Sequence, residues 1–383
     1  MQDRERGAEI ERQHDRVPVT LLTGFLGAGK TTLLNHLIRD PEAGRIAVIM
    51  NELGDVGLDH DLIEEATEET ILMQSGCLCC SIRGDLAKPL ASLMARRKRD
   101  ELAFDRVVIE TTGIADPGPI LHTLVIDDVI APHYRLDGVV TVADAANGPR
   151  TLDAQFEAVS QVAMADLLLI TKADLVTPDA LDRFKARLSM INGTARQVRA
   201  DRGQVAPGCL FNLTAMRESV TTAGVMDWLG AAPKPDPLAG LSGFAAKPAS
   251  PATLPVSGGG SHAHHDHRIG SASIEVEEPI PANTFDFWLD TLIALKGPDI
   301  LRIKGIVHVE EVEWPFVLHG VQHIFDAPVP LKSWTGDDKT SRVVVIARDI
   351  DKGDLRASLE TLRMRPQEAQ ADGMMVHTTE MPF

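Results

Sequence analysis

Eight consecutive residues near the N-terminus combine glycines, a lysine and a threonine at the spacing of a phosphate-binding loop. The glycines leave room for backbone N–H groups to curl around phosphate oxygens. Lys30 would reach the terminal phosphates, and the Thr31 hydroxyl would bind Mg²⁺. A strand-like run precedes the segment and a helical pattern follows it, as such a loop requires. The predicted nucleotide-binding residues here are Gly24, Gly27, Ala28, Gly29, Lys30, Thr31 and Thr32.

A second acidic element follows a later apolar run. Glu110 ends the strand-like segment 106–109, and Gly113 comes three residues after it. An acidic residue at such a strand end would hold Mg²⁺, through water, and the Gly113 N–H would face the γ-phosphate. Taken alone, the segment is equally typical of an ordinary strand end. Beside the phosphate loop, it predicts Lys30, Glu110 and Gly113 as catalytic residues and Mg²⁺ as a cofactor.

The base is predicted from a Thr-Lys-Ala-Asp segment directly after the apolar run 167–170. A carboxylate at Asp174 can accept both N1–H and N2–H of guanine, whereas adenine offers neither donor there. Lys172 would lay its aliphatic stem along the base, and Thr171 stands where the usual guanine signature has asparagine. The pattern favours GTP over ATP.

Three of the four cysteines, Cys77, Cys79 and Cys80, fall within four residues. We expect them on one turn, between a strand at 70–73 and a helix at 82–97, where three soft thiolates could hold Zn²⁺, Cu⁺ or an iron–sulfur group. A redox pair and plain buried thiols are the alternatives. The fourth, Cys209, is expected in a core strand at 209–211.

Two further segments carry metal-ligand chemistry. Glu52 and Asp55 follow the second strand-like run and could serve Mg²⁺ or a transferable ion; an acidic, glycine-containing loop is the alternative. Four histidines fall within six residues of a Pro- and Gly-rich stretch, which predicts a weak accessory metal site or, alternatively, a solvated loop. These histidines are His262, His264, His265 and His267.

The elements around these residues indicate an α/β domain. Nearly continuous apolar strands alternate with helical patterns, which favours a mostly parallel sheet covered on both faces. A smaller α+β domain with an antiparallel sheet is expected after the Pro- and Gly-rich stretch. The predicted boundaries are a flexible N-terminus at 1–16, a P-loop domain at 17–230, a linker at 231–268, a C-terminal domain at 269–367 and a tail at 368–383.

The amino-acid composition argues against some classes of binding partner. The 383 residues carry 38 Lys plus Arg and 55 Asp plus Glu, a formal charge of −17, which argues against nucleic acid or an anionic membrane as main partner. The charged N-terminus lacks an apolar signal core, and the four cysteines fit a reducing compartment, so a cytoplasmic location is expected.

Together these motifs resemble the CobW family of P-loop GTPases. The matching stretches are Gly24–Thr32, Asn51–Asp59, Gly76–Cys80, Glu110–Pro117 and Thr171–Asp174, with Leu301–Gly305 and Leu318–His323 in the second domain. The resemblance implies GTP hydrolysis coupled to delivery of a metal, usually zinc; some members are tied to cobalt in cobalamin synthesis or to nitrile hydratase activation. Asp55 stands where some members carry glutamate.

The resulting hypothesis is a slow GTPase that holds zinc, or a similar divalent ion such as Co²⁺, at its CxCC motif. It would pass that ion to a client metalloprotein. A metal sensor or storage protein with a regulatory GTP site and an ATP-using small-molecule kinase are the alternatives. The oligomeric state is left open between monomer and homodimer.

Overall fold

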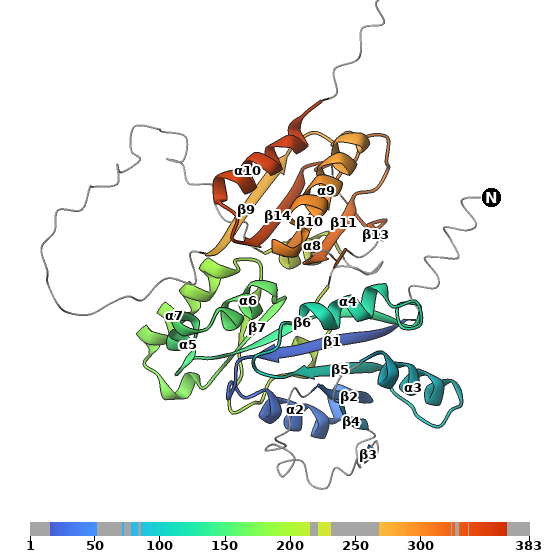
Figure 1. Ribbon diagram of the computed structural model, residues 1–383, viewed down its shortest axis with the longest axis vertical. Helices are drawn as coiled ribbons and strands as arrows, with labels where there is room; N and C mark the ends of the chain where they lie inside the picture. The colour runs from blue at the N-terminus through green and yellow to red at the C-terminus, as the bar shows by residue number, and fades with distance from the viewer. Residues whose placement is uncertain are drawn as a thin grey trace, which may run out of the picture.

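The computed structural model describes residues 16–51, 71–72, 78–82, 86–214, 221–230, 268–322, 324–325, 329–335 and 337–365. It contains two sheets with different topologies, as expected for a P-loop α/β domain followed by a smaller α+β domain (Figure 1). The predicted metal-ligand residues Glu52, Asp55 and Cys77 and the histidine cluster at 262–267 lie outside the described residues.

The first sheet has eight strands in the order β3-β4-β2-β5-β1-β6-β7-β8. All neighbouring strands run parallel except β3, which is antiparallel to β4. The loops that follow the parallel strands therefore meet at one edge of the sheet. The strands are β1 (Val17–Gly24), β2 (Ile46–Asn51), β3 (Ile71–Leu72), β4 (Leu78–Ile82), β5 (Arg106–Thr111), β6 (Tyr134–Asp144), β7 (Leu167–Thr171) and β8 (Arg196–Arg199).

Helices cover both faces of this sheet, and the strands are apolar on both faces for that reason. One face packs against α2 (Lys30–Arg39) and against Leu210 and Phe211. The other face packs against α3, α4, α6 and α7. The elements on that side are α3 (Ala87–Lys98), α4 (Gly118–Ile126), α5 (Gly148–Ala154), α6 (Phe156–Met164) and α7 (Pro178–Ile191); the short 3₁₀ helices are η1 (Pro41–Ala43), η3 (Ala173–Leu175) and η4 (Pro207–Cys209).

The second sheet is antiparallel, in the order β12-β11-β10-β14-β9 with β13 paired to β11. Two helices, α9 and α10, pack on one of its faces. Its elements are β9 (Ile269–Val276), α9 (Ala282–Lys296), η6 (Gly297–Asp299), β10 (Ile300–Val307), β11 (Phe316–Val321), β12 (Ile324–Phe325), β13 (Val329–Pro330), β14 (Ser341–Arg348), α10 (Lys352–Glu360) and η7 (Thr361–Arg363).

The opposite face of the second sheet rests on the first domain, so the two domains stack in Figure 1. Every residue of β10 is buried, because its two faces meet different neighbours. Ile303 and Val307 face α9 and α10, whereas Arg302 and Lys304 point toward the first domain. The helix α8 (Thr222–Leu229) also packs against this second sheet.

Several expected elements differ from those observed. Residues 209–211 do not form a strand: Pro207 begins a 3₁₀ turn, so Cys209 is partly exposed rather than in the core. The backbone of Cys79 and Cys80 pairs with β2 inside β4, not on a turn, and the next helix starts at Ala87 instead of residue 82.

No helix in the described part of the chain is both long enough and apolar enough to cross a membrane.

Candidate nucleotide site

The loop between β1 and α2 has the shape of a phosphate cradle. Gly24, with φ +138°, lies so close to β6 that an added Cβ would stand 2.4 Å from the Val142 carbonyl oxygen. Gly29 precedes the first turn of α2 with φ +104°, a conformation that side chains rarely adopt. The sequence therefore needs glycine at both ends of the loop. The N-terminus of α2 opens at its centre, where unpaired backbone N–H groups favour an anion.

The Lys30 amine is held at the mouth of this loop. Its Nζ donates to the carbonyl oxygens of Gly24 at 2.7 Å and Phe25 at 3.3 Å, and the side chain is only 8% exposed. This position puts a buried positive charge against the first two residues of the loop. Lys30 is the residue that the sequence predicts to reach the terminal phosphates.

Two oxygen ligands for a divalent cation lie beside the cradle. The Thr31 hydroxyl, in the first turn of α2, donates to Glu110 Oε1 at 3.3 Å. Glu110 lies in β5 and is 8% exposed. Neighbouring ligands of an octahedral Mg²⁺ ion stand about 3 Å apart, given bonds of about 2.1 Å. This hard, all-oxygen pair therefore fits the predicted Mg²⁺, either directly or with water completing the shell.

The turn after β5 presses its backbone against the cradle. A Cβ added to Gly113 would stand 2.5 Å from the Leu26 backbone nitrogen, so only glycine permits this approach. The buried Gln161 of α6 holds the turn from behind: its Nε2 donates to the carbonyl oxygens of Gly113 and Ala115, both at 3.2 Å. The turn is thus fixed where a γ-phosphate could reach its N–H.

Replacing Gly113 with alanine should lower the GTP hydrolysis rate on the order of 10²-fold, because the methyl group displaces the turn by part of an ångström from its aligned position. GDP affinity should change only a few-fold, since the cradle itself is untouched. Single-turnover hydrolysis and fluorescent-GDP titration measure the two effects.

Gly208→Ala is the matched control for that substitution, because a Cβ at Gly208 meets nothing within 4 Å. It should leave both quantities at their wild-type values. The role of the close approach to Leu26 in catalysis would be refuted if the two variants lost the same hydrolysis rate. It would also be refuted if Gly113→Ala lowered GDP affinity as much as it lowered hydrolysis.

The Thr-Lys-Ala-Asp segment is tied to the same cradle. Thr171 ends β7, and its buried hydroxyl donates to the Ala28 carbonyl oxygen at 2.7 Å. Lys172, with φ +54°, donates to the Gly27 carbonyl oxygen at 2.8 Å. Asp174 lies two residues further on, in η3, and is exposed. Threonine in place of asparagine thus still anchors the segment to the loop, and Asp174 stays accessible to a base.

Two residues of the site were not predicted from the sequence. Asp144, at the end of β6, accepts from Lys172 Nζ at 2.7 Å and from Asn147. Burial alone would raise the pKa of Asp144, but these donors outweigh it and hold the pKa below its usual range. A carboxylate at a strand end was the signal that identified Glu110 and could have identified Asp144. Gln161 gives no such signal, because it lies mid-helix.

The predicted transferable-metal ligands are not brought together by the described part of the chain. Cys77, Glu52 and Asp55 lie outside it, as do the four clustered histidines. Cys79 and Cys80 are described by their backbone alone, opposite Val48 and Ile49 of β2. Within the described residues, no group of three or more His, Cys, Asp or Glu side chains gathers as a metal site.

The second domain touches the turn that leaves the cradle. Gln322, at the bend between β11 and β12, donates from Nε2 to Asp116 Oδ1 at 3.2 Å. Asp116 follows Gly113 by three residues, and its Oδ1 also accepts from the Gly118 backbone N–H at the start of α4. One short segment, 113–118, therefore contacts the phosphate cradle at one end and the second domain at the other.

The chain is similar in sequence and in structure to known proteins. The chain is 30% identical over 349 residues to the zinc chaperone YjiA of Escherichia coli, covering 91% of this chain and 99% of that protein. It is 29% identical to the zinc chaperone CobW of Pseudomonas aeruginosa, covering 90% and 91%. The solved structure of Zn(II)-bound YjiA GTPase from E. coli matches with a TM-score of 0.65 at 29% identity, over 91% of this chain and 99% of that one.

Family models match both domains in order. Residues 18–199 match the nucleotide-binding domain described as CobW/HypB/UreG, and residues 269–363 match the cobalamin synthesis protein cobW C-terminal domain. The two matches cover the cradle, the Glu110–Asp116 turn, the Thr171–Asp174 segment and the second sheet. With the full-length similarity to YjiA, they establish that the chain belongs to the CobW family of P-loop GTPases.

Proposed function

We propose that this chain is a GTP-hydrolysing zinc metallochaperone: it splits GTP into GDP and phosphate and uses that cycle to deliver zinc to a client metalloprotein. The observation that carries the proposal is the 113–118 segment, which joins the phosphate cradle to the second domain through Gly113 and Asp116. Relatives named zinc chaperones support the choice of metal.

The nucleotide half of the proposal rests on the geometry of the cradle. Lys30 would neutralise the terminal phosphates, Thr31 and Glu110 would hold Mg²⁺, and the Gly113 N–H would face the γ-phosphate. Mg²⁺ would supply charge neutralisation between the β- and γ-phosphates. Guanine would be selected by Asp174, which has free access to the base because Thr171 and Lys172 fix the segment to the loop.

The metal half rests on the cysteine motif. Cys77, Cys79 and Cys80 would hold the transferable ion, with Glu52 or Asp55 as a further ligand and the four histidines at 262–267 as an accessory site. Three thiolates leave one of the four positions of zinc open, which suits an ion that must be passed on. Reduced, closely spaced thiols also fit a cytoplasmic protein.

Coupling between the two halves would run through the 113–118 segment. When GTP is present, its γ-phosphate would hold the Gly113 turn against the loop; after hydrolysis that contact would be lost. Because Asp116 lies three residues away and bonds to Gln322, the second domain would register the change. A client docked partly on that domain would then receive the ion while the turn relaxes. The slow intrinsic rate of GTP hydrolysis would thus regulate delivery of the ion.

The test replaces Cys77, Cys79 and Cys80 together with serine in the full-length protein. Zinc bound per chain should fall from about one to near zero. GTP binding should persist, because none of these cysteines belongs to the predicted nucleotide-binding residues. The measurement is metal analysis after dialysis, followed by GTP-dependent release of zinc to a colorimetric chelator. Cys209→Ser is the matched control, since Cys209 lies in η4 and is not part of the CxCC motif.

Each alternative has its own outcome in these assays. Unchanged zinc stoichiometry in the triple variant would refute the cysteine site. Steady GTP turnover with zinc retained throughout would favour a sensor or storage protein. Tighter binding of ATP than of GTP would favour the small-molecule kinase, and preferential retention of Co²⁺ would point to a client in cobalamin synthesis or nitrile hydratase activation.

A further inference from the structure

A pocket of about 480 Å³ opens at the edge of the first sheet opposite the phosphate cradle. Arg45, Phe104 and His133 line it, and they stand just before β2, β5 and β6 respectively. The cradle follows the other ends of these parallel strands, about 20 Å away for a strand of six residues. Pockets of 300–1,000 Å³ are the usual size for small-molecule sites. This pocket is therefore separate from the nucleotide site and large enough for a ligand.

Positive charge is concentrated on one side of this pocket, although the chain as a whole is strongly acidic. The end of α3 carries four consecutive cations, Arg96 to Arg99. Arg96 and Arg99 both pair with Glu101. Arg97 and Lys98 line the pocket, and among the described residues neither has a carboxylate within 4 Å. Two cations that form no salt bridge among the described residues thus face the same cavity.

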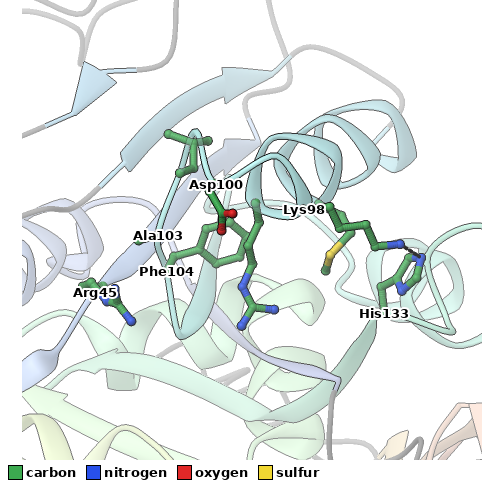
Figure 2. A pocket seen from close by; sticks show the side chains of 9 residues that line it. Arg45, Lys98, Asp100, Ala103, Phe104 and His133 are labelled. Atoms are coloured by element: carbon green, nitrogen blue, oxygen red, sulfur yellow. Dashed lines mark hydrogen bonds between the residues drawn. The ribbon is translucent and has the colours of Figure 1, made fainter.

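The contact between Lys98 and His133 strengthens this observation. Lys98 Nζ lies 3.0 Å from His133 Nε2, and Figure 2 shows the two side chains meeting at one side of the pocket. Both groups can carry positive charge, so the contact requires a neutral imidazole. Burial first, and then the Lys98 charge, hold the pKa of His133 below its usual range. An anion placed here would allow the His133 ring to take up a proton beside Lys98, because its negative charge would offset the Lys98 charge.

The inner wall of the pocket is apolar. Met94, Leu102 and Phe104 line it and are almost fully buried. The Arg97 guanidinium lies 5.5 Å from the centre of the Phe104 ring, which holds this cation at the boundary between the apolar wall and the basic side. Among the described residues, Asp100 is the only acidic residue that lines the pocket. Arg45 also lines it, but its guanidinium forms a salt bridge with Asp105. The pocket therefore offers an apolar wall and a cationic side to the same occupant.

We propose that this pocket binds a small organic anion, with its phosphate or carboxylate group between Arg97, Lys98 and His133 and its apolar body against Met94 and Leu102. The ring nitrogen of His133 and the Lys98 amine would both donate to the anion once it is bound. The pocket lies at the edge of the sheet opposite the cradle, so its occupant would not compete with the nucleotide for space.

Phenyl phosphate is the probe, because it joins a dianion to a flat ring. Calorimetric titration into full-length protein saturated with GDP and Mg²⁺ keeps the cradle occupied, so the remaining saturable binding reports the pocket. Inorganic phosphate should bind at least tenfold more weakly, because it lacks the ring. Benzoate distinguishes a carboxylate ligand from a phosphate ligand. On binding, the His133 ring resonances should shift and its pKa should rise.

Arg97→Gln with Lys98→Gln should weaken phenyl phosphate binding at least tenfold, since charge-assisted contacts are lost. Lys98→Gln alone removes an exposed side chain without disturbing the packing of Arg97 and should still weaken binding several-fold. Arg99→Gln, which removes a neighbouring cation already paired with Glu101, should bind as the wild type does. No saturable binding, or binding that the double variant leaves intact, would overturn the proposal, and equal affinity for inorganic phosphate would overturn its apolar half.

Discussion

Replacing Lys30 with alanine should reduce kcat/KM for GTP by about 10³-fold or more. A charged donor aimed at developing phosphate charge in a water-poor site carries an effect of this order. Here Lys30 is 8% exposed, and its amine donates to the Gly24 and Phe25 carbonyl oxygens, whereas the Lys172 amine is bound to Gly27 and Asp144. Phosphate release under steady-state conditions measures the loss.

The control for this variant is Lys296→Ala, which removes an exposed lysine in the last turn of α9. Its turnover should stay at the wild-type value. Thermal unfolding of both variants separates a catalytic loss from a folding defect, because the Lys30 amine donates to two carbonyl oxygens of the loop and its removal should affect unfolding little. Turnover within tenfold of the wild type in Lys30→Ala would contradict the assignment of the cradle.

The nucleotide site could be predicted from the sequence because its chemistry is local. Gly24 to Thr31 are contiguous, and the strand before them and the helix after them are set by their own apolar patterns. Glu110 and Thr171 each end an apolar strand, and parallel strands bring such ends to one edge. The local sequence patterns and the parallel order of the strands together therefore predict that these separate segments surround one loop.

Residues whose role depends on distant partners could not be predicted in this way. Gln161 acts on a turn 46 and 48 residues away in the sequence, and Gln322 bonds to Asp116 across 206 residues. Neither glutamine differs locally from an ordinary helix or turn residue. Gln161 meets its turn only when α6 packs on the first sheet, and Gln322 meets Asp116 only when the second domain packs on the first, so no local pattern records either contact.

The elements that were wrongly predicted share a physical cause. Leu210 and Phe211 are buried, as their apolarity indicates, but Pro207 begins a 3₁₀ turn that buries them without a strand. At Cys79 and Cys80, the pattern of thiols favoured a turn, whereas pairing with β2 extends the sheet. Apolarity predicts burial well; the backbone conformation that achieves it depends on neighbouring strands and on proline.

The interface between the domains leads to the second large prediction, because its centre is charged. Asp166 lies between α6 and β7 and is fully buried. Its carboxylate pairs with Arg302 and, at 3.4 Å, with Lys304, and it also accepts from the Val139 backbone N–H. Burial alone would raise the pKa of Asp166, but the charges of Arg302 and Lys304 outweigh it and hold the pKa below its usual range.

Asp166→Ala should lower the free energy of unfolding by about 3–5 kcal/mol, because it leaves two buried cations without their counter-charge. Both Arg302 and Lys304 are 1% exposed, so water cannot replace the carboxylate. The midpoint of urea unfolding, followed by tryptophan fluorescence, measures the loss. Trp228 is a suitable reporter, since Lys304 Nζ lies 5.1 Å from the centre of its ring.

Asp349→Asn is the control for an exposed pair: Asp349 also meets an arginine, Arg268, but both side chains are 44% exposed. Its cost should stay within about 1 kcal/mol. A loss in Asp166→Ala no larger than this would contradict the assigned role of the buried cluster.

A second substitution separates attraction from the penalty of an unpaired charge. If the loss in Asp166→Ala comes mainly from cations left without a counter-charge, adding Arg302→Met should restore part of the stability, because it removes one of them and fills its volume. If it comes mainly from the lost attraction, the double variant should be no more stable than the single one. Recovery would mean that the main role of Asp166 is to neutralise the buried cations of β10 at the interface. The surrounding apolar contacts would then hold the domains together.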